Sequence, residues 1–130
     1  MSKPILCLDF DGVCHAYTSG WKGAELIPDD AVPGLFAFLE QAAHHFDIQV
    51  FSSRSNHPGG IEAMQEWFKQ QYRKWLSEGG QGGELPPISF PVQKPAAFVT
   101  LDDRAITFTG QWPDVDFLRN FQPWYKTSPR

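Results

Sequence analysis

The chain has 130 residues, a length typical of a single domain, and a formal net charge of -4. Apolar residues make up 42% and charged residues 20%, so a core can form and global disorder is excluded. The acidic balance leaves no basic face for an extended nucleic-acid track, and no apolar run approaches the roughly 20 residues that span a bilayer. Nothing resembles a signal peptide, so we expect a cytoplasmic protein without membrane partners.

The first half of the chain alternates apolar runs of strand length and helix length. Residues 5–8 form a continuous apolar run, typical of a strand buried on both faces of a parallel sheet. Residues 13–30 carry glycines and a proline without a sustained period, which predicts a loop or small hairpin, here called the flap. Helical spacing over 31–46 predicts a helix with Asp29 and Asp30 as capping candidates, and a second strand follows over 48–51.

The second half continues the alternation with shorter elements. They are expected in this order: a helix over 61–76, a glycine-rich flexible loop over 78–87, a short strand over 88–92, a clearer strand over 97–101, a further strand over 106–109 and a last helix over 114–121. Strands that alternate with helices predict an α/β domain with a largely parallel sheet.

Polar side chains follow three of the predicted strands at the point where each strand ends. They are Asp9 and Asp11 after the first, Ser52, Ser53 and Arg54 after the second, and Asp102 and Asp103 after the strand over 97–101. In open α/β sheets the ligand crevice lies at the carboxyl ends of the strands. Side chains two apart in an extended segment point to the same side, so Asp9 and Asp11 can converge on one point. Clustered carboxylates repel unless a cation relieves them, and hard oxygen ligands suit Mg²⁺. The alternative is that Asp11 and Gly12 are merely a turn signal.

These residues also resemble four motifs of the haloacid dehalogenase superfamily, in the expected order. Asp9-Phe10-Asp11-Gly12-Val13 is similar to the first motif, D-x-D-G-[TV] after an apolar strand. Ser52 matches the second motif, with Ser53 as the alternative, Lys94 matches the third, and the pair Asp102-Asp103 matches the fourth. The resemblance implies a single three-layer Rossmann-like domain with a central, mostly parallel sheet and a magnesium-dependent phosphohydrolase activity.

The same resemblance implies a role for each matching residue. Asp9 would attack phosphorus and form an aspartyl-phosphate, and Asp11 would act as general acid and then general base. Mg²⁺ would lie between Asp9, the backbone carbonyl of Asp11, and Asp102 or Asp103; which of that pair contacts the ion is left open. Ser52 would hydrogen-bond a phosphoryl oxygen, and Lys94 would stabilise the transferring group, although a plain surface role is the ordinary interpretation of any lysine.

The spacing of the motifs limits what can cover the site. Neither 14–30 nor 55–93 has room for a cap domain, so the chain resembles the capless branch, whose open site suits a bulky phosphorylated substrate or a lid from a second subunit. Within the flap, Tyr17, Trp21 and His15 are candidates for contact with the leaving group. For Tyr17 and Trp21 the alternative is that they pin the flap to the core. Arg54 and Arg104 either hold substrate anions or form structural ion pairs.

Two other functions remain open from the sequence: a phosphotransferase, and a module that binds metal or phosphate without turnover. The oligomeric state is also open between monomer and homodimer. The observation in favour of a homodimer is a group of aromatic residues near the carboxyl terminus: Trp112, Phe121, Trp124 and Tyr125.

Overall fold

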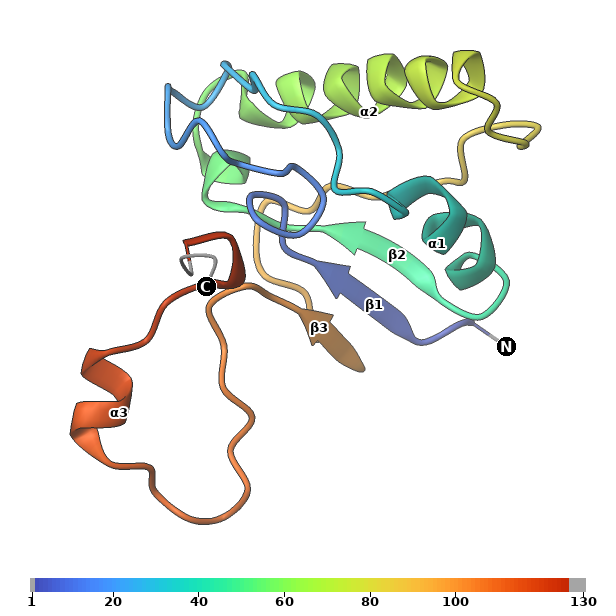
Figure 1. Ribbon diagram of the computed structural model, residues 1–130. Coiled ribbons are helices and arrows are strands. Elements are labelled where there is room, and N and C mark those ends of the chain that lie inside the picture. Colours follow the sequence, from blue (N-terminus) through green and yellow to red (C-terminus); the bar gives the residue numbers. More distant parts are fainter. Residues whose placement is uncertain (1, 127–130) are drawn as a thin grey trace.

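Three short parallel strands form the centre of this computed structural model, which describes residues 2–126 (Figure 1). They are β1 (Ile5–Leu8), β2 (Asp47–Val50) and β3 (Val99–Leu101), and they lie in the order β2-β1-β3. The register pairs Leu8 with Val50 on one side and with Leu101 on the other. The expected α/β class with a parallel sheet is therefore confirmed, although the sheet is small.

Helices of very different length connect and follow these strands. The α-helices are α1 (Leu35–Ala42), α2 (Gly60–Ser77) and α3 (Val115–Arg119), and two 3-10 helices cover Ser53–Asn56 and Trp124–Lys126. Figure 1 shows α2 lying across one side of the sheet and α3 standing away from it at the end of a long loop. None of the helices in residues 2–126 is long and apolar enough to cross a membrane.

The core lies where α1 and α2 meet the sheet. Alternate strand residues such as Leu8 and Val50 are buried and join one cluster with Leu39 from α1 and Phe68 from α2. Phe10, fully buried just beyond β1, packs edge-on against Trp67 with ring centroids 5.0 Å apart. Because Phe10 stands between two candidate aspartates, the packing of its ring anchors the loop that carries them.

The helix expected over 31–46 begins later and ends earlier than the apolar spacing predicts. Gly34 precedes it with φ of 93°, in the left-handed region, so a right-handed helix cannot extend back through this residue. The expected capping by Asp29 and Asp30 is wrong. The Asp29 carboxylate accepts hydrogen bonds from Ser19, and Asp30 binds Lys74 at 2.7 Å.

Two expected strands are not formed as strands. Ser89 makes only an isolated bridge to Gln49, because the neighbouring Pro91 has no N–H to extend a ladder. Residues 106–109 pair with no strand among the residues that the structure describes. They belong to a segment over 105–121, called the arm below, which also contains α3. The alternating residues at 106–109 have no neighbouring strand within residues 2–126 to pair with.

Candidate functional site

Asp9, Asp102 and Asp103 bring three carboxylates together at the carboxyl end of the sheet. One carboxylate oxygen from each lies within 4.8 Å of the others. The backbone holds this arrangement, because the Asp9 N–H donates to the carbonyl of Leu101 at 3.0 Å and continues the pairing of β1 with β3. Arg104 N–H donates to Asp102 Oδ1 at 2.8 Å and closes a turn directly after β3. The carboxyl ends of β1 and β3, which the sequence predicted to lie together, therefore do so.

The electrostatics of Asp9 reflect this crowding. Burial raises the pKa of Asp9 to about 8, and a hydrogen bond with Asp103 and the negative charges of Asp102 and Asp103 add to the effect. A cation placed among these oxygens would favour the charged form of all three carboxylates. A set of carboxylate oxygens, partly open to solvent, is the donor set that Mg²⁺ accepts in proteins. The residues present therefore fit a divalent cation.

A pocket of about 140 Å³ opens beside the carboxylates and collects residues from separate parts of the chain. Its lining residues are Cys7, Asp9, Phe51, Ser52, Ser53, Lys94, Thr100 and Asp102. Sites for complete small molecules commonly occupy about 300–1,000 Å³, so this pocket has room for a small group such as a phosphoryl and not for a whole ligand. The structure places Lys94, which is exposed, and both candidate serines at one hollow with Asp9.

Ser52 and Ser53 differ in what their side chains already do. Ser52 is buried at the N-terminus of the 3-10 helix Ser53–Asn56, and its hydroxyl oxygen accepts the N–H of Arg54 at 3.1 Å. The Ser52 N–H donates in turn to Ser55 Oγ, which completes a capping box. Accepting one bond leaves the Ser52 hydroxyl proton available to donate into the pocket. Ser53 lines the same pocket but is exposed.

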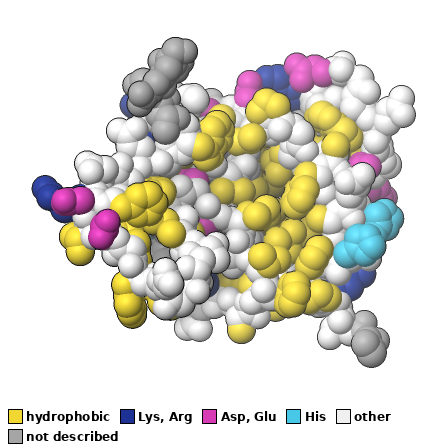
Figure 2. Space-filling view, turned by 60° about the horizontal axis from the view of Figure 1, so that its bottom comes forward, with side chains coloured by type: hydrophobic (Ala, Val, Ile, Leu, Met, Phe, Trp, Pro, Cys, Tyr) yellow, Lys and Arg dark blue, Asp and Glu magenta, His cyan; other side chains and the backbone are white. Residues whose placement is uncertain are grey.

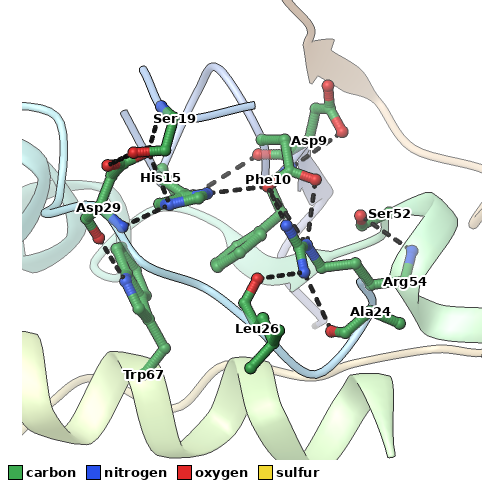
Figure 3. Close-up of polar contacts among 12 residues, drawn as sticks. Asp9, Phe10, His15, Ser19, Ala24, Leu26, Asp29, Ser52, Arg54 and Trp67 are labelled. Carbon is green, nitrogen blue, oxygen red and sulfur yellow. Dashed lines mark hydrogen bonds and ion pairs between the residues drawn. The ribbon is translucent and has the colours of Figure 1, made fainter. Parts of the chain in front are cut away.

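Asp11 is turned to a different set of partners. Its carboxylate is not part of the three-carboxylate cluster, and it accepts hydrogen bonds from Arg54 Nε and Nη2 at 3.0 and 3.1 Å. Arg54 is fully buried, and its Nη1 donates to the backbone carbonyls of Gly23, Ala24 and Leu26 in the flap (Figure 3). Arg54 therefore forms a structural ion pair here, and its guanidinium is not directed at the pocket residues.

His15 completes the surroundings of Asp11 and is also fully buried. Its Nε2 accepts the backbone N–H of Asp29 at 3.1 Å, so the ring proton of a neutral His15 resides on Nδ1 (Figure 3). Nδ1 then donates to Asp11 Oδ1 at 2.9 Å. The sequence placed His15 only in the flap. Its role could not be seen from local pattern, because the bond depends on how the flap folds back.

The two flap aromatics pack against protein groups. Trp21 stacks over the Arg54 guanidinium at 4.7 Å and stays about half exposed. Tyr17 has φ of 62°, unusual for a residue other than glycine, and its ring packs edge-on against Tyr125 with centroids 5.9 Å apart. Trp21 thus contacts the 3-10 helix after β2, and Tyr17 contacts the carboxyl-terminal 3-10 helix.

The carboxyl-terminal 3-10 helix contributes a contact that the sequence did not reveal. Trp124 Nε1 donates to the carbonyl of Gly12 at 2.7 Å, across 112 positions of sequence. A Cβ added to Gly12 would collide with the Asp103 carboxylate and the Tyr125 ring. The segment over 124–126, called the tail here, therefore covers the loop between Asp9 and Asp11, and the Asp103 side chain is 3% exposed.

Comparisons with models of protein families, with curated proteins and with solved structures find no match to this chain.

Proposed function

We propose that this chain is a magnesium-dependent phosphohydrolase of the haloacid dehalogenase type, with a three-layer Rossmann-like architecture and no cap domain. The observation that carries the proposal is the position of Asp9. It belongs both to the carboxylate cluster and to the pocket that Ser52 and Lys94 line. A nucleophile, a cation site and two phosphate-binding groups at one hollow are the parts that phosphoryl transfer needs.

The proposed reaction begins with attack of an Asp9 carboxylate oxygen on phosphorus. The new O–P bond forms as the bond to the leaving oxygen breaks. Asp11 first turns away from Arg54 and His15 and takes up a proton from water, and it then gives that proton to the leaving oxygen. A water molecule then attacks the aspartyl-phosphate and loses a proton to Asp11, which releases inorganic phosphate and restores both aspartates. Ser52 and Lys94 hydrogen-bond the phosphoryl oxygens throughout.

A magnesium ion would be held by Asp9, Asp102 and Asp103, together with the backbone carbonyl of Asp11 that the resemblance implies. Its contribution is to offset the negative charge shared by nucleophile and phosphate. Because the pocket holds only about 140 Å³, the rest of the substrate would lie outside it. That size supports a bulky or extended phosphorylated substrate rather than a small one enclosed by this chain alone.

One observation favours the alternative of a binding module without turnover. The Asp11 carboxylate is occupied by Arg54 and His15 and is only 14% exposed, so it must turn from these partners to reach a leaving group. Trapping with beryllium fluoride separates the two functions. An active site should bind it with Mg²⁺ as a mimic of the aspartyl-phosphate, whereas phosphate binding that persists in chelator would favour the module.

The proposal is tested by hydrolysis of an aryl phosphate with magnesium and with chelator. We expect activity only with magnesium, and a loss of roughly 10³-fold or more in Asp9→Asn, because the nucleophile is removed. Asp47→Asn is the matched control, since Asp47 is an exposed aspartate at the far end of the sheet. Equal activity in wild type and Asp9→Asn would overturn the nucleophile assignment.

A further inference from the structure

The outer edge of β3 is open. β3 pairs with β1 along one side, and no segment among residues 2–126 pairs with its other side. Val99 and Leu101 are each 42% exposed. An open strand edge with apolar side chains is a ready template for another strand.

An apolar groove of about 200 Å³ continues from this edge. It is lined by Leu8, Val13, Val32, Pro33, Gly34, Leu35, Phe38 and Leu101. Figure 2 shows apolar side chains gathered on this face, with charged side chains mainly at its margins. An interface core is typically depleted in charge and surrounded by a polar rim, and this face has the same arrangement.

The arm over 105–121 is the second unpartnered apolar element. Trp112 is 87% exposed, and several other large apolar side chains of the arm are about half exposed. All hydrogen bonds and ring contacts found for 105–121 in the described part of the chain stay within the arm. The arm also contains an apolar hollow of about 470 Å³, and Figure 1 shows it projecting away from the sheet.

Both ends of the arm are anchored beside the candidate site. It follows Asp103, which belongs to the carboxylate cluster, and it returns to Trp124, which is bonded to Gly12. With both ends held at one place, the arm projects as a loop. Within residues 2–126, residues 106–109 pair with no strand, although their alternation of β-branched and aromatic residues suits one.

We propose that the chain forms a two-fold homodimer in which each arm covers the β3 edge and apolar groove of the other copy. Residues 106–109 add to the open edge of β3 as an extra strand. One chain thus carries both complementary surfaces, and reciprocal exchange closes the assembly after two copies. This inference does not depend on the proposed phosphohydrolase activity.

The exposed area is sufficient for such a dimer. At about 200 Å² for each aromatic side chain, the exposed fractions of five residues correspond to on the order of 600 Å². These five are Phe98, Phe108, Trp112, Phe117 and Phe121. A stable interface buries about 800 Å² on each partner, and the exposed aliphatic residues of β3 and the arm would supply the remainder.

The test is the mass of the full chain in solution, measured by size-exclusion chromatography with multi-angle light scattering. We expect twice the 14.7 kDa of one chain for the wild type. Phe108→Glu in the arm and Phe98→Glu beside β3 should each shift the mass to that of a single chain. Leu26→Glu, on an exposed flap leucine outside both surfaces, should leave the dimer intact.

Circular dichroism separates loss of association from loss of folding. If Phe108→Glu unfolds, Trp112→Glu replaces it, since a side chain that is 87% exposed contributes little to the fold of its own chain. A wild type that stays at the mass of one chain at all concentrations would overturn the proposal, as would a dimer that survives both the arm and the β3 substitutions, or association that continues beyond two copies.

Discussion

Arg54 and Asp11 form a buried ion pair that joins the second strand end to the loop after the first. Arg54 Nε lies 3.0 Å from Asp11 Oδ2, and the arginine side chain is fully buried while that of Asp11 is 14% exposed. The same guanidinium binds three flap carbonyls, from Gly23, Ala24 and Leu26. One side chain therefore ties together the flap, the proposed acid–base residue and the 3-10 helix after β2.

Arg54→Gln should be strongly destabilising. The substitution leaves the Asp11 carboxylate buried without its cation, a change that costs about 3–5 kcal/mol in comparable buried pairs. Urea denaturation measures the free energy of unfolding, and limited proteolysis should show earlier cleavage in the flap. Arg119→Gln is the control, because Arg119 pairs with Asp116 at an exposed site and should change stability by less than about 1 kcal/mol. Similar losses in both variants would contradict this account of Arg54.

Gly12→Ala should lower the stability of the protein more than Gly20→Ala, the matched glycine substitution. Gly12 and Gly20 both have positive φ, 83° and 74°, so alanine strains the backbone at either position. A Cβ at Gly20 meets no atom within 4 Å, whereas at Gly12 it collides with Asp103 and Tyr125. We expect a loss of about 1 kcal/mol for Gly20→Ala and a clearly larger one for Gly12→Ala in thermal unfolding. Equal losses would show that contact with the tail adds nothing.

Ser52→Ala should lower stability and activity together. Removing the hydroxyl removes the cap on the Arg54 N–H, a change of about 1 kcal/mol, and also removes a proposed donor to the phosphoryl group. Ser52→Thr keeps both functions and should restore most of each. Ser53→Ala, at the exposed neighbour, should leave stability unchanged in urea denaturation. Aryl phosphate hydrolysis by the three variants then decides which serine acts, and normal activity in Ser52→Ala would exclude it.

The stability of the metal-free protein should fall as pH rises. The pKa of Asp9 is raised from 3.8 to about 8 in the folded state, by burial and by Asp102 and Asp103. The folded state therefore keeps a proton that the unfolded chain has already released, and it is progressively disfavoured between about pH 4 and pH 8. We expect this slope in urea denaturation with chelator and a smaller slope in Asp9→Asn. Saturating magnesium should raise the stability of the wild type at the upper end of this range. Identical slopes in the two proteins would contradict the raised pKa.

The local sequence pattern predicted those strands and helices whose formation depends on residues close together in the chain. The apolar run of β1 was located to the residue, and the helical period of α2 predicted a helix within one residue at each end. The clustering of the polar strand ends was also predictable from sequence, because parallel pairing places the carboxyl ends of strands at one edge of the sheet. For that reason Asp9 and Asp102 were expected together, and they lie together in the structure.

Contacts between distant residues were decided only by the tertiary structure. Asp11 and Arg54 are 43 positions apart, and Gly12 and Trp124 are 112 apart, so no local period reports either bond. Residues 106–109 pair with no strand in the part of the chain that the structure describes. These residues favour a strand, but a strand forms only where another backbone offers hydrogen bonds. The aspartate pair after β1 was therefore evident from sequence. Only the folded chain shows that Asp9 joins the carboxylate cluster while Asp11 binds Arg54.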